Sequence, residues 1–560
     1  MDNNQIADHF SLLSKLMDIH GENTFKSKSY STAAYTIEKL QQQLSTIPIE
    51  KIATINGIGS SSALKIIEII ETGKLNSLEE LINKTPKGVI EMLNIKGVGP
   101  KKINTIWKEM EIETIGELLY ACKENRLKLY KGFGEKTQQN VIETIEFYFK
   151  SKGSYLYAQV ELIVPEIESF LLKIFNSQKI ELTGAYKRQL EIIDQLEFLI
   201  EDEITTIEKT LLHVEGFTLK ENGTGYLLYS TLLGIDVKIY IANKINFIEE
   251  SIKLSSSDEF WQEIQKKRSL IEATPTTVEH FFQQMEIPTI PPYLREQAQT
   301  IQQFSKNDPP QPIEIEDIKG IIHSHSNWSD GSNTIEEMAN AAISKGFEYL
   351  VISDHSKSAF YAQGLSIDRI IAQHQYIDEL NKKIKSFKIY KSIESDILND
   401  GNLDYPNEIL SRFDLVIASI HSNLKMNEEK AMMRLIKAIE NPFTTILGHM
   451  TGRLLLSRPG YPVDHKKIID ACAANKVVIE LNAHPSRLDI DWRQLSYALE
   501  KNVLISINPD AHQIEGMNDV KYGVKVAQKA MLPKERNLSS FTLDQFEDYI
   551  TSTTKEKTKI

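Results

Sequence analysis

The sequence contains very little cysteine, with two cysteines, Cys122 and Cys472, among 560 residues. Two cysteines cannot form the disulfide framework of a small secreted domain, and they cannot supply a cysteine-rich zinc module. A metal site in this chain would therefore be built from histidine and carboxylate side chains. Such ligands suit Mn, Zn or Fe(II), and the sequence leaves the choice among these ions open.

Long apolar runs and a signal sequence are also lacking. No stretch approaches the roughly 18 apolar residues that span a bilayer, and the first residues, MDNNQIADHF, show no basic segment followed by an apolar one. We therefore expect a cytoplasmic protein without a membrane partner. The length of 560 residues, with 41% apolar and 25% charged residues, predicts three or four ordinary globular domains.

Positive charge is in deficit, since the formal net charge is -13. This balance argues weakly against nucleic acid, because lysine and arginine that neutralise phosphates normally dominate such binding. Lysines are nevertheless concentrated beside glycine-containing turns between residues 96 and 136. This local concentration favours DNA contact by that segment alone.

Residues 1 to about 150 are typical of an all-helical region in which three Gly-x-Gly turns each lead into a helix. A single turn of this kind usually does no more than join two helices. Three copies, two of them with trailing lysines, favour helix-hairpin-helix modules, whose backbone N–H groups contact DNA phosphates. The candidate DNA-binding residues are Gly57, Gly59, Gly97, Gly99, Lys101, Lys102, Gly132, Gly134 and Lys136.

Between residues 318 and 512, seven short apolar segments each run into a polar residue and then into a helical pattern. This recurrence predicts a parallel β/α barrel, whose strand ends meet on one face and would bring distant side chains together as metal ligands. Lone histidines within helical segments, such as His374 and His465, are expected to face solvent. The strand ends carry His323, His325, Asp354, His355, Glu394, Asp396, His421, His449, Asn482, His484, Asp510 and His512.

The segment Ile321-Ile322-His323-Ser324-His325, followed by Ser329-Asp330-Gly331, resembles the opening motif of the PHP (polymerase and histidinol phosphatase) domain, and the later strand ends fit that family in order. The resemblance implies up to three divalent ions, Mn²⁺ and/or Zn²⁺, with Glu394 bridging two of them. Such ions activate water and offset charge on phosphoryl oxygens. The implied ligands are His323, His325, Asp330, His355, Glu394, His421, His449, Asp510 and His512.

Two arginines, Arg453 and Arg487, follow strand ends of the same region. Either could clamp a phosphate with two parallel hydrogen bonds, and either could equally form a structural salt bridge. The sequence leaves both interpretations open.

With helix-hairpin-helix turns in front and a PHP domain behind, the whole chain resembles a bacterial family X DNA polymerase. The segment His20-Gly21-Glu22-Asn23 with Phe25 is similar to the lyase-type domain of that family. Lys65 follows the first turn, where lyase-competent relatives carry a Schiff-base lysine. A solvated helix lysine is the alternative.

The central region is predicted to mix α-helices and β-strands, and it departs from the family at its polymerase site. The family carries an Asp-x-Asp pair and a third Asp, whereas this chain has Gln195-Leu196-Glu197 and keeps only Asp236. A neutral amide at position 195 cannot bridge two Mg²⁺ ions, and the neighbouring Asp194 would point to the opposite face of a strand. The segment that follows is short for a thumb. We expect a degenerate palm whose polymerase activity is weak or lost.

These observations predict a multidomain protein with three kinds of fold: an all-α helix-hairpin-helix region, an α+β nucleotidyltransferase-like palm with a shortened thumb, and an α/β PHP barrel of about seven parallel strands. The expected ranges are 1–90 for a lyase-like domain with the first hairpin, 91–152 for further hairpins, 153–305 for the palm and thumb, 306–317 for a polar linker, 318–545 for the PHP domain and 546–560 for a frayed tail.

The resemblance implies a DNA-repair phosphodiesterase, and a 3′-5′ exonuclease is the activity expected of the family. Abasic-site or 3′-phosphate processing is a plausible extension. The expected partner is gapped, nicked or 3′-ended DNA, and the sequence does not indicate an oligomeric state. An active gap-filling polymerase and a small-molecule phosphatase, similar to histidinol-phosphate relatives, remain as alternatives.

Overall fold

The structure is a computed structural model that describes residues 2–40, 42–95, 97–150, 153–175, 179–271, 273–305 and 311–557. The chain divides into two compact units, Met1–Phe147 and Tyr148–Ile560. Residues 306–310 of the expected linker and residues 558–560 of the expected tail lie outside the described residues. Among the described helices, none is both long and apolar enough to cross a membrane.

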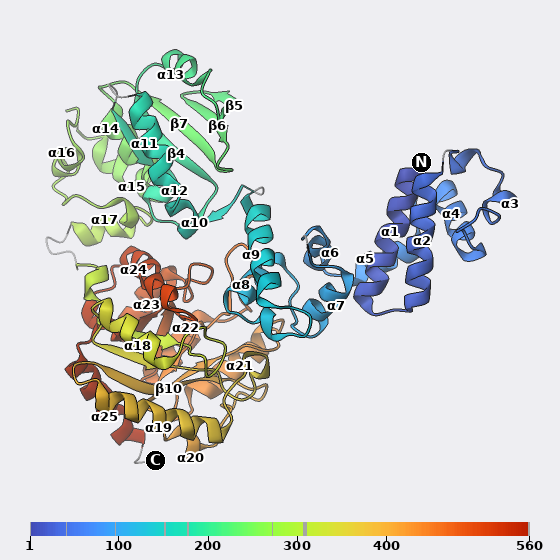
Figure 1. Ribbon diagram of the computed structural model, residues 1–560. Coiled ribbons are helices and arrows are strands. Elements are labelled where there is room, and N and C mark those ends of the chain that lie inside the picture. Colours follow the sequence, from blue (N-terminus) through green and yellow to red (C-terminus); the bar gives the residue numbers. More distant parts are fainter. Residues whose placement is uncertain are drawn as a thin grey trace. The chain divides into compact units, whose positions relative to one another are not determined.

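The first unit is all-helical, as the sequence predicts (Figure 1). Its first helix begins after Asp2, whose carboxylate accepts a hydrogen bond from the Gln5 backbone N–H at 2.8 Å. Phe10 and Tyr30 pack edge to face between the first two helices, with ring centroids 5.9 Å apart. The helices are α1 Asn3–His20, α2 Thr24–Lys39, α3 Ile49–Ile52, α4 Ser60–Thr72, α5 Asn76–Lys84, α6 Lys87–Glu91, α7 Pro100–Lys108, α8 Ile115–Lys123 and α9 Glu135–Lys150.

The three Gly-x-Gly turns of this unit have the same conformation. In each turn the first glycine has a left-handed φ between 88° and 93°, which a residue with a Cβ rarely adopts. The middle residue is buried in each turn, and the carbonyl of the second glycine accepts a hydrogen bond from the first turn of α4, α7 or α9. The three turns are therefore repeats of one structural unit. They are Gly57-Ile58-Gly59, Gly97-Val98-Gly99 and Gly132-Phe133-Gly134.

The second unit begins with a mixed α/β region around a five-stranded sheet of order β2-β4-β7-β6-β5. β4 and β7 are parallel, and the other neighbouring pairs are antiparallel. The elements are β1 Tyr155–Leu156, α10 Tyr157–Glu161, α11 Val164–Ile174, β2 Ile180–Thr183, α12 Gly184–Lys187, β3 Ile192–Ile193, β4 Gln195–Glu201, α13 Ile204–Leu211, β5 Phe217–Gly223, β6 Tyr226–Thr231, β7 Asp236–Ala242 and α14 Phe247–Leu254.

Three further helices follow this sheet in the range expected for the shortened thumb: α15 Asp258–Arg268, α16 Val278–Gln283 and α17 Gln299–Phe304. They contribute to a hydrophobic cluster in which Trp261 and Phe281 stack at 6.4 Å between ring centroids. Arg295 is buried beside them and donates hydrogen bonds to the Ile290 carbonyl and the Ser255 hydroxyl, both at 2.8 Å. This cluster also includes Leu199 of β4 and Ala242 of β7, so the three helices pack against the five-stranded sheet.

The C-terminal region is a nearly closed barrel of seven parallel strands, as expected (Figure 1). The strands are largely buried along their length because helices cover their outer face. The elements are β8 Gly320–Ser324, α18 Ile335–Ser344, β9 Tyr349–Ile352, α19 Ile367–Lys383, β10 Lys388–Asp396, α20 Asn407–Leu410, β11 Leu415–Ser419, α21 Glu428–Ile439, β12 Ile446–Leu447, α22 His465–Asn475, β13 Val478–Asn482, α23 Leu495–Glu500, β14 Ile505–Asn508, α24 Val520–Lys529 and α25 Leu543–Lys557.

The two edges of the barrel approach each other through a parallel bridge between Ser324 and Ala511. The expected boundary between barrel and tail at residue 546 falls inside α25. Phe546 is fully buried there and stacks on Tyr349 with centroids 4.3 Å apart. The first part of the expected tail therefore belongs to the barrel, because its apolar face packs on strand β9.

Helix α24 of the barrel also makes hydrogen bonds and ion pairs with the palm region. The buried Lys529 ammonium donates to the Arg188 carbonyl at 2.7 Å and lies 3.6 Å from the Glu296 carboxylate. Glu161 of the palm pairs with Lys521 at 2.7 Å. These contacts explain why palm and barrel form one compact unit.

Candidate metal centre

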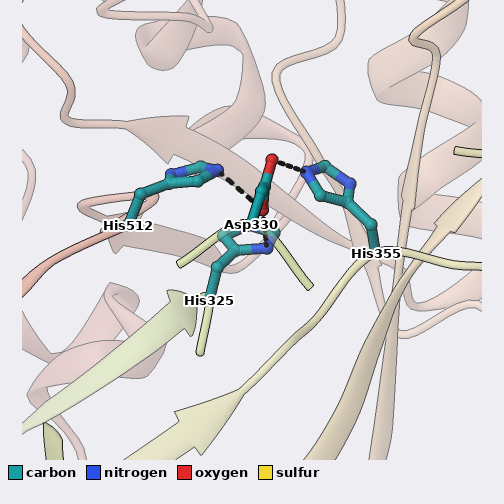
Figure 2. A group of neighbouring side chains, drawn as sticks. All are labelled: His325, Asp330, His355 and His512. Atoms are coloured by element: carbon teal, nitrogen blue, oxygen red, sulfur yellow. Dashed lines mark ion pairs between the residues drawn. The ribbon is translucent and has the colours of Figure 1, made fainter. Parts of the chain in front are cut away.

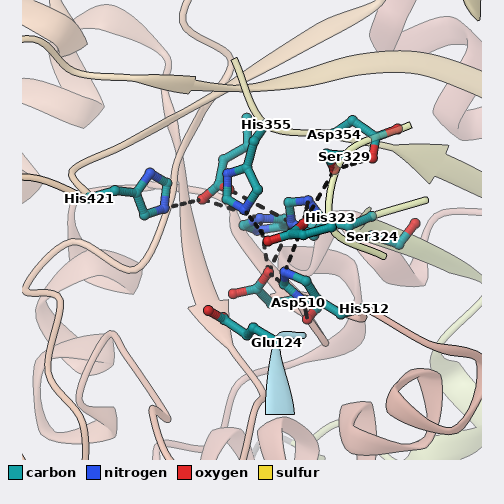
Figure 3. A network of polar contacts seen from close by, with 12 residues as sticks. Glu124, His323, Ser324, Ser329, Asp354, His355, His421, Asp510 and His512 are labelled. Atoms are coloured by element: carbon teal, nitrogen blue, oxygen red, sulfur yellow. Dashed lines mark hydrogen bonds and ion pairs between the residues drawn. The ribbon is translucent and has the colours of Figure 1, made fainter. Parts of the chain in front are cut away.

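The strand ends of the barrel bring the expected ligands into one buried cluster. His323 lies on β8 and Glu394 on β10, while the other ligands follow strand ends in loops. Three overlapping groups each place their ligand atoms within 4.8 Å of one another. Figure 2 shows the first group, and Figure 3 shows several of the side chains converging on one centre. The groups are His325, Asp330, His355 and His512; His323, His325 and Asp510; and His355, Glu394 and His421.

Glu394 lies at the middle of this cluster. Its Oε1 is 3.4 Å from His323 Nε2 and 3.1 Å from His421 Nε2. The same oxygen lies 3.0 Å from His449 Nε2, which brings in the ninth expected ligand. Its Oε2 lies 3.0 Å from His355 Nδ1. The carboxylate thus faces several histidines with both oxygens, which is the arrangement that a bridging ligand requires.

Two features of the cluster fit a set of divalent ions. One is the spacing of its ligand atoms, and the other is a group of buried nitrogen and oxygen atoms that make no hydrogen bond among the described residues. Ligand bonds of about 2.0–2.2 Å place neighbouring ligand atoms about 3 Å apart, and the separations around Glu394 are close to that value. His323 Nε2, His325 Nδ1 and Glu394 Oε2 are buried and make no hydrogen bond among the described residues. Buried polar atoms of this kind normally have a partner, and a bound cation would supply one.

The electrostatics of the cluster also favour cations. Burial lowers the pKa of His323, but the carboxylates of Glu480, Asp510 and Glu394 outweigh it and hold that pKa well above its ordinary value. Burial raises the pKa of Asp330, but His355 and His512 hold it well below the usual range. Carboxylates that stay ionised beside imidazoles are ready to exchange the imidazole protons for divalent ions.

Backbone strain accompanies two of the ligands. His323 has φ 63° and Asp510 has φ 54°, in the left-handed region that side chains with a Cβ avoid. A register shift between Ile321 and Ser324 lies at the same point of β8. Such strain costs on the order of 1–3 kcal/mol per residue and is typical of functional sites.

One supporting residue, Glu480 on β13, is absent from the sequence expectations. Its buried carboxylate accepts from His323 Nδ1 at 2.6 Å and from the His449 backbone N–H at 3.1 Å. It also accepts from the Asn508 amide at 2.7 Å. The first bond leaves His323 Nε2 available to the cluster. The signal in the sequence was an acidic residue inside an otherwise apolar strand.

Two acidic strand-end residues that are not family ligands have supporting roles as well. Asp396 accepts from His421 Nδ1 at 2.5 Å, which orients that ring toward Glu394. Asp354 accepts from the Ser326 backbone N–H at 2.8 Å and from the Gln373 amide at 2.6 Å. It therefore fixes the loop that carries Asp330.

The two arginines are placed differently. Arg453 donates to the Arg487 carbonyl at 2.9 Å, to Asp491 at 2.6 Å and to the Leu488 carbonyl, so its guanidinium is committed to the loop around it. These contacts favour the structural interpretation of Arg453 over the phosphate clamp. Arg487 is buried, and its Nε lies 3.8 Å from Asp510 Oδ2. Arg487 alone remains a candidate for phosphate contact.

The expectation for His374 is also wrong. His374 does not face solvent: it is buried on α19 with its ring edge-on to Phe413 at 4.9 Å. Burial, assisted by Lys391, lowers its pKa to about 4. The sequence did not show that this face of α19 packs inward.

The palm site lacks an equivalent cluster among the described residues. Gln195 and Asp236 are paired across β4 and β7, as expected for the family, but Asp236 forms an ion pair with Lys220 at 2.6 Å. The Gln195 amide donates to Glu197 at 2.7 Å. Asp194 accepts from the Ser154 hydroxyl at 2.7 Å. Each of these carboxylates is therefore paired with a donor group of the protein.

In the first unit, the Lys65 ammonium donates to the Ser77 hydroxyl at 2.7 Å and lies 5.7 Å from the centre of the Tyr30 ring. In the second and third hairpins, a Cβ built on either glycine would meet no atom within 4 Å. Lys101 and Lys136 are exposed beside these open turns. The hairpins therefore offer unobstructed backbone next to positive charge.

Comparison with known proteins supports this arrangement. Residues 322–484 match the model of the PHP domain, residues 1–75 that of a helix-hairpin-helix domain, and residues 89–146 that of a SAM-like helix-hairpin-helix tandem. A "Probable phosphatase" of Acetivibrio thermocellus is 27% identical over 42% of this chain and 96% of its own length. A "Probable phosphatase" of Caldanaerobacter subterraneus is 25% identical over 41% of this chain and 89% of its own length.

A relative of nearly full length is the "DNA polymerase/3'-5' exonuclease PolX" of Bacillus subtilis. It is 31% identical over 95% of this chain and 96% of its own length. With the helix-hairpin-helix and PHP matches in the same order, the chain belongs to the bacterial family X DNA polymerases that carry a PHP domain.

Proposed function

We propose that this protein is a metal-dependent 3′-5′ exodeoxyribonuclease of DNA repair, whose active site is the PHP metal centre. The convergence of the eight other expected ligands, all but His421 buried, around Glu394 carries this proposal. The similarity to a PolX protein whose name includes a 3′-5′ exonuclease supports the direction of cleavage. Abasic-site or 3′-phosphate processing would use the same centre.

Each part of the centre has a distinct task in this proposal. Bound Mn²⁺ or Zn²⁺ ions would activate the attacking water and offset the charge that develops on the phosphoryl oxygens. Glu480 holds the His323 ring so that Nε2 faces the centre, and Asp396 does the same for His421. Arg487, which lies beside Asp510, would contact a phosphate oxygen of the substrate.

We propose that the palm has weak polymerase activity or none. Two-metal nucleotidyl transfer needs carboxylates that hold both ions. Here Lys220 neutralises Asp236, and Gln195 replaces a carboxylate and donates its amide to Glu197. A palm of this kind would serve as a scaffold, and Mg²⁺ would have few ligands in it.

DNA is the proposed partner, with a gap, a nick or a free 3′ end. The open glycine turns beside Lys101 and Lys136 favour phosphate contacts that are independent of sequence. Lyase activity of Lys65 is a separate proposal. Borohydride trapping of the protein on an abasic-site oligonucleotide tests it, and an adduct that persists in Lys65→Ala would reject it.

The first test is denaturing electrophoresis of a 5′-labelled primer on a gapped template, incubated with Mn²⁺ and all four deoxynucleotides. Shortening of the primer is the expected result. Lengthening that disappears in Asp236→Ala would show instead that the protein is an active gap-filling polymerase. A 3′-labelled primer that loses its label in the first step gives the polarity of cleavage.

A small-molecule phosphatase is the second candidate, and the two probable phosphatases that match the barrel favour it. Release of inorganic phosphate from phosphomonoesters such as histidinol phosphate, with no cleavage of DNA, would support this candidate. We expect the reverse, because three hairpin repeats have no evident use in hydrolysis of a free metabolite.

A further inference from the structure

The loop between β9 and α19 lies next to the metal centre and is held in a fixed shape. Its two ends are joined by a bridge between Ser356 and Leu365, and the Leu365 N–H donates to the carbonyl of the ligand His355 at 2.9 Å. A Cβ at Gly364 would lie 1.8 Å from the Ser356 carbonyl oxygen, so only glycine allows this close return. Ala359 and Ala362 of the loop are fully buried.

Phe360 lies at the outer turn of this loop, in a 3₁₀ helix Phe360–Ala362, and 79% of its surface is exposed. Among the described residues of the barrel, the other exposed large apolar side chains are aliphatic, and each is less than 40% exposed. Single exposed apolar residues are common on protein surfaces, so exposure alone assigns no role. Its place on a loop whose end is hydrogen-bonded to the ligand His355 distinguishes this ring from the others.

A chain of aromatic contacts connects Phe360 with the metal centre. Its ring lies 6.1 Å from the Tyr361 ring, and the Tyr361 ring lies 6.4 Å from the ring of the ligand His355. Lys357 is exposed in the same loop and adds a positive charge on this side of the centre. An exposed aromatic ring next to a lysine is the combination with which proteins hold single-stranded nucleic acid without sequence preference.

We propose that Phe360 is a stacking platform for the terminal nucleobase of the DNA strand whose last phosphodiester reaches the metal centre. The inference rests on the proposed nuclease function and adds a binding subsite to it. Lys357 would contact the backbone of the same nucleotides. Stacking would favour a frayed or single-stranded end, because a paired terminal base is not available to the ring.

The decisive experiment measures the first cleavage step of two 5′-labelled single strands with Mn²⁺-loaded full-length enzyme. One strand ends in a normal nucleotide, and the other ends in a tetrahydrofuran residue, which has no base. For the normal end, we expect Phe360→Ala to raise KM about 5- to 150-fold, the range that corresponds to loss of one stacked base, with kcat little changed. For the baseless end, the variant and the wild type should have the same KM.

Two further variants separate stacking from other causes. Phe360→Trp should restore the wild-type KM, whereas Phe360→Leu, which is apolar but cannot stack, should behave like Phe360→Ala. Equal KM values for wild type and Phe360→Ala on both strands would overturn the proposal. An equal rise on both strands, or full rescue by leucine, would overturn it as well, because neither result requires a stacked base.

A binding measurement keeps this inference separate from the proposed function. The probe is a strand with a 3′-terminal 2-aminopurine next to a baseless residue, mixed with full-length protein in EDTA so that the strand stays intact. Quenching by the wild type and by Phe360→Trp, and its absence in Phe360→Ala, would support stacking even if no cleavage is found with Mn²⁺. Cleavage without any Phe360-dependent quenching or KM change would leave the nuclease in place and reject the platform.

Discussion

The palm and the barrel both place carboxylates on parallel strands, but they surround them with different neighbours. In the palm, Asp236 pairs with Lys220, and Glu197 accepts the amide of Gln195. In the barrel, Glu394 is surrounded by histidines. A histidine can give up its proton and become a metal ligand, whereas a lysine ammonium or a glutamine N–H cannot accept a cation. Carboxylates therefore indicate a metal centre only when their partners can also serve as ligands.

The largest expected effect comes from removing the negative charge of Glu394 in the barrel, and the matched change at Asp236 in the palm is its control. Glu394→Gln should reduce phosphodiester hydrolysis by more than about 100-fold and lower the metal content, because the shared ligand is lost. The isosteric Asp236→Asn should change neither quantity. Cleavage assays and elemental analysis of both variants provide the measurement. A loss of activity in Asp236→Asn would show that the palm takes part in the reaction.

A smaller effect is expected from Glu480, which contacts ligands without being one of the expected nine. Glu480→Gln should weaken metal affinity or activity about 10- to 100-fold, because the charge is lost and a single amide oxygen cannot accept from His323, Asn508 and the His449 N–H as both carboxylate oxygens do. The Mn²⁺ concentration for half-maximal cleavage and the bound metal per chain report the change. Glu336→Gln, on the exposed face of α18, is the matched control. An unchanged metal requirement would show that Glu480 has only a packing role.

The barrel also allows a comparison between ligand histidines and one buried histidine that is not a ligand. The pKa of His374 is lowered to about 4, whereas the unfolded chain binds that proton near 6.5. Its contribution to stability is therefore complete above about pH 6.5 and is lost as the pH falls toward 4, by about 2 kcal/mol at pH 5. His374→Phe should remove this acid sensitivity. Urea unfolding at pH 5 and 7.5 measures it, and a difference between variant and wild type that is the same at both pH values would contradict the assignment.

The smallest expected effect concerns the hairpins of the first unit. Lys101→Ala and Lys136→Ala should each weaken DNA binding several-fold and lower the slope of log K against log salt concentration by about 0.9 for duplex DNA or 0.7 for a single strand. Lys220→Ala in the palm serves as the control, since its ammonium is already paired with Asp236. Fluorescence anisotropy at several salt concentrations measures both. An equal slope change in Lys220→Ala would place DNA on the palm instead.

Several features of the fold could be predicted because they depend on local pattern. The Gly-x-Gly turns could be recognised because a left-handed φ needs glycine, and the barrel strands because buried parallel strands are continuous apolar runs. The tail was misjudged because Phe546 lies in a polar stretch, and its burial depends on a tyrosine almost two hundred residues earlier.

The sequence by itself determined the residue types at the strand ends and hence the candidate metal ligands, since a parallel barrel brings those ends together. Only the tertiary structure decided which polar groups are engaged elsewhere. It assigned Arg453 to its own loop, turned His374 inward and placed Glu480 behind His323. The physical reason is that hydrogen bonds and burial join residues far apart in the chain, and no periodic pattern records such pairs.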